Sequence, residues 1–180
     1  MKKKVFVTGI SGMVGSHLAD YILEHHPDYE VHGLIRWRSP RDNIRHIEDR
    51  LYLHQGDLRD LKSLVSIFQE YAFNYVFHLA AQSYVMSSFN SPNDTFQTNV
   101  LGTINLLDTI LLTDRHPRML MCSSSEVYGQ VTQDEVPIQE TQPFRPASPY
   151  AVSKCTQDLI AYQYGLNYGM DILKKLVKKL

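Results

Sequence analysis

Short apolar runs alternate along this chain with longer stretches in which apolar residues recur at helical spacing. The short runs predict strands near residues 4–8, 30–36, 51–55, 75–79 and 118–123. The longer stretches predict helices over residues 13–24, 60–71, 94–113 and 149–167. Strands and helices that alternate in this way form right-handed βαβ units, so the pattern predicts an α/β fold with a doubly wound parallel sheet.

A proline-rich segment over residues 129–149 interrupts this pattern. Its prolines, which disfavour a central strand or a helix interior, are Pro137, Pro143, Pro146 and Pro149. We therefore expect a long surface loop here. Loops of this length in a compact domain are usually functional or disordered.

Composition narrows the class of protein. With 180 residues, of which 43% are hydrophobic and 21% charged, the chain has the size and composition of one globular domain. A net charge of −1 predicts neither a nucleic-acid partner nor a membrane partner, and no stretch approaches the ~20 apolar residues of a membrane span. Cys122 and Cys155 lie far apart in no metal-ligand or redox spacing, so we expect a cytoplasmic protein without a metal site.

A glycine-rich turn follows the first predicted strand and opens the first predicted helix. Gly9 suits a tight turn, Gly12 lets the backbone approach a diphosphate, and Gly15 allows close helix packing. With Ser11 and Met13, these residues are candidate ligands of a dinucleotide whose phosphates would lie at the helix N-terminus. A plain glycine turn is the alternative, and the flanking strand and helix argue against it.

Two arginines mark the end of the second predicted strand, where folds of this kind contact the adenosine ribose. An acid at this point selects NAD by accepting hydrogen bonds from the 2′-hydroxyl, but the first acid after the strand is Asp42. Because guanidinium groups bind phosphate, Arg36, Arg38 and Ser39 suit the 2′-phosphate of NADP, and NAD is less expected. A solvated basic loop is the alternative.

Two further candidates follow other predicted strands, at the sheet edge where ligands bind in this architecture. Asp57 follows the third strand and is either a cofactor contact or a helix N-cap. After the fifth strand, the Ser124 hydroxyl could bond a reacting oxygen and Glu126 could remove a carbon-bound proton. The alternative for Ser124 is a capped strand end, and the alternative for Glu126 is a solvated loop acid.

Tyr150 and Lys154 lie four residues apart on a predicted helix and therefore share a face. A tyrosine with a pKa of ~10 is a poor base at neutral pH, but a neighbouring ammonium group favours the phenolate. The pair could exchange a proton with a substrate alcohol while a nicotinamide cofactor takes the hydride. Singly, each would be an ordinary surface residue.

Taken together, these motifs resemble the extended short-chain dehydrogenase/reductase family, and within it the GDP-mannose 4,6-dehydratases. The similarity runs from Lys4 to about Asp171. Beyond the turn and the arginine stretch, it is carried by residues 56–58, 78–83, 124–129 and 148–154. The resemblance implies that residues 1–171 form a Rossmann domain that binds NADP, with a nucleotide-diphosphate sugar as the substrate.

The resemblance also implies a role for each candidate. Tyr150 would take the proton of the sugar C4 hydroxyl, and Lys154 would hold the nicotinamide ribose and lower the Tyr150 pKa. Ser124 would bond the C4 oxygen, and Glu126 would remove the C5 proton and help to expel the C6 hydroxyl as water. The implied cofactor contacts also include Asp57, Leu58, Leu79, Ala80 and Ala81, and the implied substrate contacts are Gln82, Ser83, Ser124 and Ser125.

Two departures from the family leave alternatives open. The dehydratases usually carry threonine at the position of Ser124, so a nucleotide-sugar 4-epimerase or 4-keto reductase is a second interpretation. Proteins of the family are also much longer, with most of the substrate-binding domain in their later part. A cofactor-binding module with little turnover is therefore a third interpretation.

The last residues predict a short basic amphipathic helix over residues 172–180. Its apolar stripe consists of Ile172, Leu173, Leu176, Val177 and Leu180. The stretch is either a membrane-surface or partner helix, or a cap on the domain. The helices predicted over residues 94–113 and from Pro149 resemble the pair through which this family dimerises, so we expect a homodimer or a higher homo-oligomer.

Overall fold

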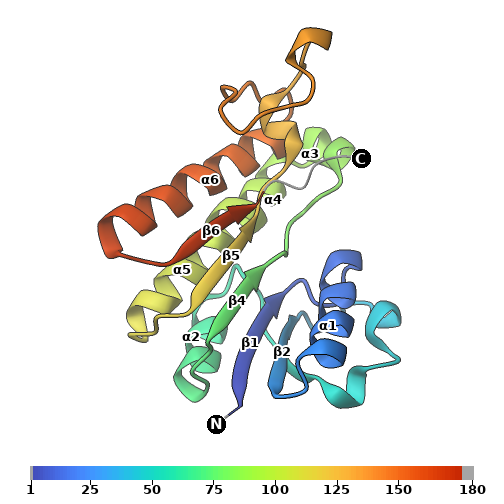
Figure 1. Ribbon diagram of the computed structural model, residues 1–180, viewed down its shortest axis with the longest axis vertical. Helices are drawn as coiled ribbons and strands as arrows, with labels where there is room; N and C mark the ends of the chain where they lie inside the picture. The colour runs from blue at the N-terminus through green and yellow to red at the C-terminus, as the bar shows by residue number, and fades with distance from the viewer. Residues whose placement is uncertain (1, 176–180) are drawn as a thin grey trace.

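The computed structural model describes residues 2–175, which form a six-stranded parallel sheet with helices on both faces (Figure 1). The strands are β1 (Lys3–Thr8), β2 (Tyr29–Ile35), β3 (Tyr52–Gln55), β4 (Tyr75–His78), β5 (Arg118–Cys122) and β6 (Ile172–Lys175). Their order in the sheet is β3-β2-β1-β4-β5-β6. This order confirms the predicted doubly wound α/β fold, and it places a topological switch point between β1 and β4, where such folds bind ligands.

Six α-helices cover the two faces of the sheet. They are α1 (Met13–His25), α2 (Leu61–Glu70), α3 (Val85–Asn90), α4 (Pro92–Phe96), α5 (Gly102–Leu112) and α6 (Pro149–Tyr168). The alternation along β1 separates two apolar cores, because Val5 and Val7 pack with Ile22 of α1, whereas Phe6 packs on the opposite face with Leu64 of α2 and Leu106 of α5. Figure 1 shows α1 on one side of the sheet and α2, α5 and α6 on the other.

The helix predicted over residues 94–113 contains a feature that its periodicity did not indicate. Between α4 and α5 the chain forms a π-helical turn, η3 (Gln97–Leu101), without leaving helical dihedral angles. Such turns are rare and often lie at functional sites. Here the turn carries Asn99, whose buried side chain reaches the segment after β4.

The boundaries of α6 follow from local chemistry. The Ser148 hydroxyl accepts a hydrogen bond of 3.0 Å from the amide of Ala151, and Pro149 occupies the first turn, where a missing N–H costs nothing. The helix ends before Gly169, which adopts the left-handed conformation with φ +66°. The predicted helix was therefore confirmed within one residue of its end.

The structure corrects the expected helix over residues 172–180. Residues 172–175 form strand β6, which pairs in parallel with β5 so that Ile172 lies opposite Met119. The amide of Met119 donates to the carbonyl of Asp171 over 2.8 Å, and Arg118 pairs with the Asp171 carboxylate over 2.7 Å. The free edge of β5 thus supplies backbone partners that outweigh the local helical spacing. Residues 176–180 lie outside the described part of the chain.

The proline-rich segment after β5 is a surface loop, as predicted. It contains only a short 3₁₀ turn at Gln133–Glu135 between Gly129 and the start of α6. The loop returns to the domain where the amide of Arg145 donates to the carbonyl of Val127 over 2.9 Å, and an ion pair joins Arg145 to Glu135. Within residues 2–175, no helix is both long enough and apolar enough to cross a bilayer.

Candidate active site

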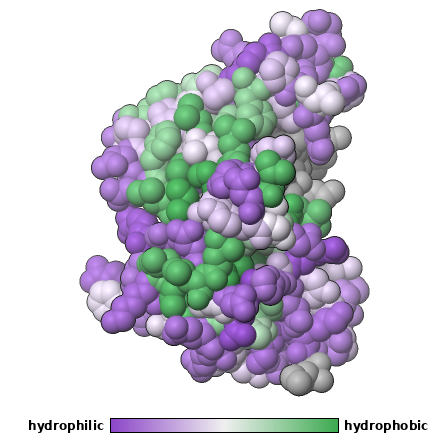
Figure 2. Space-filling model, turned by 90° about the vertical axis from the view of Figure 1, so that its left-hand side faces the viewer, coloured by the Kyte–Doolittle hydropathy of each residue, from purple (hydrophilic) through white to green (hydrophobic). Residues whose placement is uncertain are grey.

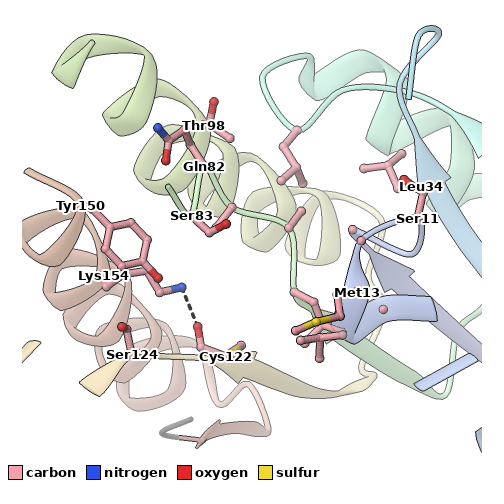
Figure 3. A pocket seen from close by; sticks show the side chains of 18 of the residues that line it. Ser11, Met13, Leu34, Gln82, Ser83, Thr98, Cys122, Ser124, Tyr150 and Lys154 are labelled. Atoms are coloured by element: carbon pink, nitrogen blue, oxygen red, sulfur yellow. Dashed lines mark hydrogen bonds between the residues drawn. The ribbon is translucent and has the colours of Figure 1, made fainter. Parts of the chain in front are cut away.

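The carboxyl ends of the strands open into one cleft with a volume of about 710 Å³. It extends from the turn between β1 and α1, which carries Ser11 and Met13, to the first turns of α6, which carry Tyr150 and Lys154 (Figure 3). The cleft brings together every site residue predicted from the sequence except Arg38. Residues that were not among the predicted site residues but that also line it are Val14, Leu34, Gly56, Arg59, Val85, Asp94, Thr98, Cys122 and Ser123.

The glycine turn has the close backbone packing that its spacing predicts. Gly9 adopts φ +74°, and a Cβ there would lie 2.9 Å from the backbone of Ala80. A Cβ on Gly15 would lie 2.2 Å from the carbonyl oxygen of Gly9. Gly12 is the N-cap of α1 and, having no side chain, leaves the first N–H groups of the helix without a side-chain cap. The turn therefore presents backbone donors and a helix N-terminus to the cleft.

A side chain from the β2–β3 connection supports this turn. The Asn43 carboxamide donates a hydrogen bond of 3.0 Å to the carbonyl of Ser11. The two residues are 32 positions apart in sequence. No local pattern indicates this contact, so the sequence analysis missed it.

The basic stretch after β2 lies at the far end of the cleft. Arg36 and Ser39 line the cleft itself, while Arg38 lines an adjoining hollow together with Arg36. The amide of Arg36 donates to the Ser39 hydroxyl over 3.0 Å, which closes the loop on itself. The Arg38 guanidinium lies 4.7 Å from the centre of the Trp37 ring, within the range of a cation–π contact.

A third arginine at this end, Arg59, escaped the sequence analysis. Its guanidinium pairs with Asp57 over 3.2 Å and with Asp94 of α4 over 3.2 Å, so it links the loop after β3 to the helix across the cleft. Burial raises the pKa of the Asp57 carboxyl, but the hydrogen bonds and charge of Arg59 outweigh burial and lower this pKa below its ordinary value. Asp57 is thus ionised at neutral pH, and it is not the N-cap of α2, which is Asp60.

Tyr150 and Lys154 lie on one face of α6, as their spacing predicts, and both are largely buried. The Lys154 ammonium donates a hydrogen bond of 2.6 Å to the carbonyl of Cys122, drawn as a dashed line in Figure 3. This contact joins α6 to the end of β5.

Burial is the largest influence on the pKa of Tyr150. Burial raises the pKa of the phenol above its ordinary value, the Ser124 side chain partly offsets this rise, and the charge of Glu126 adds to it. The Lys154 ammonium instead donates to the carbonyl of Cys122. The lowering of the Tyr150 pKa by Lys154, which the resemblance implies, stays a prediction.

The serine run at the end of β5 contributes to the cleft and to a helix cap. Ser124 lines the cleft, and its hydroxyl also accepts a hydrogen bond of 3.2 Å from the amide of Glu126, which caps the 3₁₀ turn η4 (Ser125–Tyr128). Ser123 instead donates to the buried carboxylate of Asp158 on α6 over 3.0 Å. Because Ser124, Glu126 and Tyr150 line the same cavity, a hydroxyl group, a carboxylate and a phenol can reach one bound molecule.

The sequence profile of the family described as GDP-mannose 4,6 dehydratase matches residues 6–177. The chain belongs to this family. The match runs past Asp171, where the sequence analysis had ended the resemblance. Among the described residues, no group of three or more His, Cys, Asp or Glu side chains is arranged to hold a metal ion.

Comparisons with individual proteins agree with membership of the GDP-mannose 4,6-dehydratase family. A GDP-mannose 4,6-dehydratase from Vibrio cholerae is 40% identical over 94% of this chain and 48% of its own length. DesIV, a dTDP-glucose 4,6-dehydratase from Streptomyces venezuelae solved with NAD, is 31% identical with a TM-score of 0.85, covering 96% of this chain and 55% of its own. RMD from Pseudomonas aeruginosa, solved with NADPH, is 34% identical with a TM-score of 0.79, covering 96% of this chain and 53% of its own. The chain thus spans about half the length of the relatives it matches.

Proposed function

We propose that this chain is the NADP-binding part of a nucleotide-sugar 4,6-dehydratase that converts GDP-mannose to GDP-4-keto-6-deoxymannose. One observation carries the proposal: a single cleft joins the diphosphate-type turn at Gly9 to the side chains of Tyr150, Lys154 and Glu126. Membership of the family, and relatives that act on nucleotide sugars, support the substrate class. Two free cysteines are consistent with a protein of the cytoplasm.

The residues of the cleft fit a nicotinamide dinucleotide. A Cβ on Gly12 would lie 3.2 Å and a Cβ on Gly15 2.2 Å from the carbonyl oxygen of Gly9, so only glycines allow the tight turn whose amides would meet a diphosphate. Leu79, Ala80 and Ala81 offer an apolar wall. Lys154 lies where an ammonium could bond a ribose hydroxyl. When bound, the cofactor would accept a hydride from the sugar C4 and return it to C6.

The side chains of the chain itself would move the protons. Tyr150 would accept the proton of the C4 hydroxyl while Ser124 bonds the same oxygen. Glu126 would take the proton from C5, which becomes acidic beside a C4 carbonyl, and would return a proton to the departing C6 hydroxyl. Gln82, Ser83 and Ser125 would bond the sugar and its phosphates from the cleft wall.

Replacing Glu126 with glutamine tests the dehydratase assignment. The amide keeps the shape of the side chain but cannot accept a proton, so we expect loss of water to fall by roughly 10²–10⁴-fold. Oxidation at C4 should persist, so adding GDP-mannose to the NADP-loaded variant should give a stable absorbance of reduced cofactor. Product analysis by mass spectrometry measures the loss of water.

The controls separate this proposal from the other interpretations. Glu24→Gln changes an exposed carboxylate on α1 and should behave as the unaltered protein. Unaltered loss of water in Glu126→Gln removes Glu126 from its role. Cofactor binding by the unaltered chain without any sugar-dependent signal instead supports a binding module.

The preference for NADP over NAD is tested by Arg36→Ala and Arg38→Ala. Each change removes a guanidinium group near the proposed 2′-phosphate, so we expect NADP affinity to fall by about tenfold per arginine while NAD affinity stays within about twofold. Calorimetric titration of both cofactors measures the ratio. Arg45→Ala is the control, because this exposed arginine pairs with Asp42 outside the cleft. An unchanged preference for NADP in the Arg36→Ala, Arg38→Ala double variant contradicts the assignment.

We further propose that the chain forms a homodimer through α5 and α6. Apolar side chains gather on the molecular face on which these helices lie (Figure 2). The large exposed hydrophobic residues of α5 and α6 are Leu112, Val152, Leu159, Tyr162, Leu166 and Tyr168. Such a concentration is typical of a protein interface. A monomeric mass in sedimentation equilibrium would contradict this proposal.

A further inference from the structure

Behind the cleft, a buried chain of polar side chains connects the two halves of the site. Thr8 and His78 are the last residues of β1 and β4 and lie opposite each other in the sheet. The two ring nitrogens of His78 face in different directions: Nδ1 lies 2.8 Å from the Thr8 hydroxyl, and Nε2 lies 2.9 Å from the Thr103 hydroxyl on α5. All three side chains are buried, and none of them lines the cleft.

The contacts of Thr103 determine which ring nitrogen of His78 carries the proton. The Thr103 oxygen lies 2.6 Å from the carbonyl of Asn99, and its single hydroxyl proton is donated to this carbonyl one helical turn earlier. The same oxygen also accepts a hydrogen bond of 2.6 Å from the Gln157 carboxamide on α6. Thr103 therefore has no proton left for the ring, and Nε2 of His78 is the donor. The Gln157 nitrogen also lies 3.5 Å from Nε2, but its contact with Thr103 is much shorter, at 2.6 Å.

The assignment of Nε2 as the donor also determines the role of Nδ1. Because a neutral imidazole has one N–H, Nδ1 of His78 is an acceptor, and the Thr8 hydroxyl donates to it. The Thr8 oxygen in turn accepts a hydrogen bond of 3.2 Å from the amide of Ala80. Burial, with a smaller contribution from the charge of Lys154, lowers the pKa of His78 to about 3, so the ring is neutral at physiological pH.

The two sides of the ring hold different parts of the cleft. On one side, Thr8 directly precedes Gly9 of the glycine turn, and Ala80 belongs to the apolar wall. We call Thr8 with the Ala80 amide the turn arm. On the other side, Thr103 contacts both Gln157 of α6 and the π-helical turn that carries Asn99.

Asn99 extends this second side to the catalytic helix. Its carboxamide oxygen accepts a hydrogen bond of 2.7 Å from the backbone amide of Gln82, and its nitrogen donates one of 2.9 Å to the hydroxyl of Ser153. Ser153 donates in turn to the carbonyl of Tyr150. We call Thr103 with Asn99 and Ser153 the helix arm. The helix arm therefore connects the His78 ring to Ser153, which lies on α6 between Tyr150 and Lys154.

We propose that His78 is a positioning residue, and that its fixed Nε2–H tautomer holds the glycine turn and the catalytic helix at the separation that a dinucleotide requires. The proposal rests on the proposed function for the role of the two halves. A ring with one donor and one acceptor in fixed directions joins the arms, whereas a charged ring would present a donor to Thr8 and to Thr103 alike.

The tautomer is tested directly in the unaltered full chain by nitrogen-15 NMR of its histidine rings. We expect the His78 ring to show a protonated Nε2 and an unprotonated Nδ1, with no titration between pH 5.5 and pH 8.5, a range well above the pKa of about 3. His78→Asn identifies its signals among those of the eight histidines. A protonated Nδ1, or a ring that titrates in this range, overturns the proposal.

Two substitutions separate the arms. Asparagine at position 78 retains an acceptor near the place of Nδ1, and glutamine retains a donor near the place of Nε2. In His78→Asn we expect the Ala80 amide to keep its protection from hydrogen exchange while the Gln82 amide exchanges about tenfold faster, as for the loss of one buried hydrogen bond. In His78→Gln we expect the opposite pattern. His116→Asn, at an exposed histidine, is the matched control and should change neither amide.

The remaining outcomes are equally decisive. If the Ala80 and Gln82 amides are equally protected from hydrogen exchange in both variants, the ring does not link the two arms directionally, and the proposal is overturned. If His78→Asn instead loses protection at Ala80 and His78→Gln loses it at Gln82, the assignment of the tautomer is overturned. If a variant does not fold, the ring spectrum of the unaltered chain still decides the proposal. A chain that shows the expected ring and exchange pattern but binds no NADP contradicts the proposed function and leaves the tautomer and the two arms in place.

Discussion

Replacement of Tyr150 by phenylalanine is expected to lower turnover of GDP-mannose by roughly 10²–10⁴-fold, the usual contribution of a positioned acid or base. The change removes only the hydroxyl group and leaves the buried ring, so the packing of α6 should persist. Cofactor affinity should stay within about threefold, because the turn that we propose to bind the diphosphate lies at the opposite end of the cleft. Steady-state kinetics and cofactor titration measure the two quantities separately.

A tyrosine on α1 provides the matched control. Tyr21 is 54% exposed, and Tyr21→Phe removes the same atom away from the cleft. Its turnover should equal that of the unaltered protein. If Tyr150→Phe retained full turnover, the phenol would not be the proton acceptor, and the proposed mechanism would fail.

Replacement of Gly15 by alanine is expected to lower NADP affinity by at least about 100-fold. The added Cβ would lie 2.2 Å from the carbonyl oxygen of Gly9 and 2.7 Å from the Cα of Ile10. Both neighbours are backbone atoms, so the turn itself must move, and the N–H groups that approach the diphosphate move with it. Overpacking of this kind typically also lowers the free energy of unfolding by about 1–3 kcal/mol.

The effect of Gly15→Ala is checked by calorimetric titration and by chemical denaturation. Gly165→Ala is the control, because a Cβ at this position of α6 meets only the carbonyl oxygen of Met170, at 3.5 Å. Since alanine is the better helix former, Gly165→Ala should raise the free energy of unfolding by about 0.5–1 kcal/mol and leave NADP affinity unchanged. Normal NADP affinity in Gly15→Ala would show that the turn does not bind the diphosphate.

The two ends of the cleft depend on different kinds of interaction. The glycine turn offers backbone donors whose positions are set by close packing, as the space around Gly9 and Gly15 shows. The opposite end offers side chains whose protonation depends on burial, since burial raises the pKa of Tyr150 and lowers that of Lys154. A change at the turn should therefore alter binding first, and a change on α6 should alter turnover first.

The sequence by itself determined the features that short segments encode. The alternation of apolar runs with helical periodicity predicted five of the six strands and the course of the main helices. The spacing of Gly9, Gly12 and Gly15 after a strand predicted the turn, and the interval between Tyr150 and Lys154 placed both side chains on one helix face. These features are local because dihedral preference and residue spacing act within a few positions along the chain.

Tertiary structure decided whatever depends on partners distant in sequence. Residues 172–175 have helical spacing, yet they form β6 because the edge of β5 offers backbone hydrogen bonds. The Tyr150 pKa rises because folding buries the phenol while the Lys154 ammonium bonds the carbonyl of Cys122. The proton of His78 is assigned by Thr103, 25 residues away. Desolvation and hydrogen-bond partners exist only after packing, so no pattern within a short window could have indicated them.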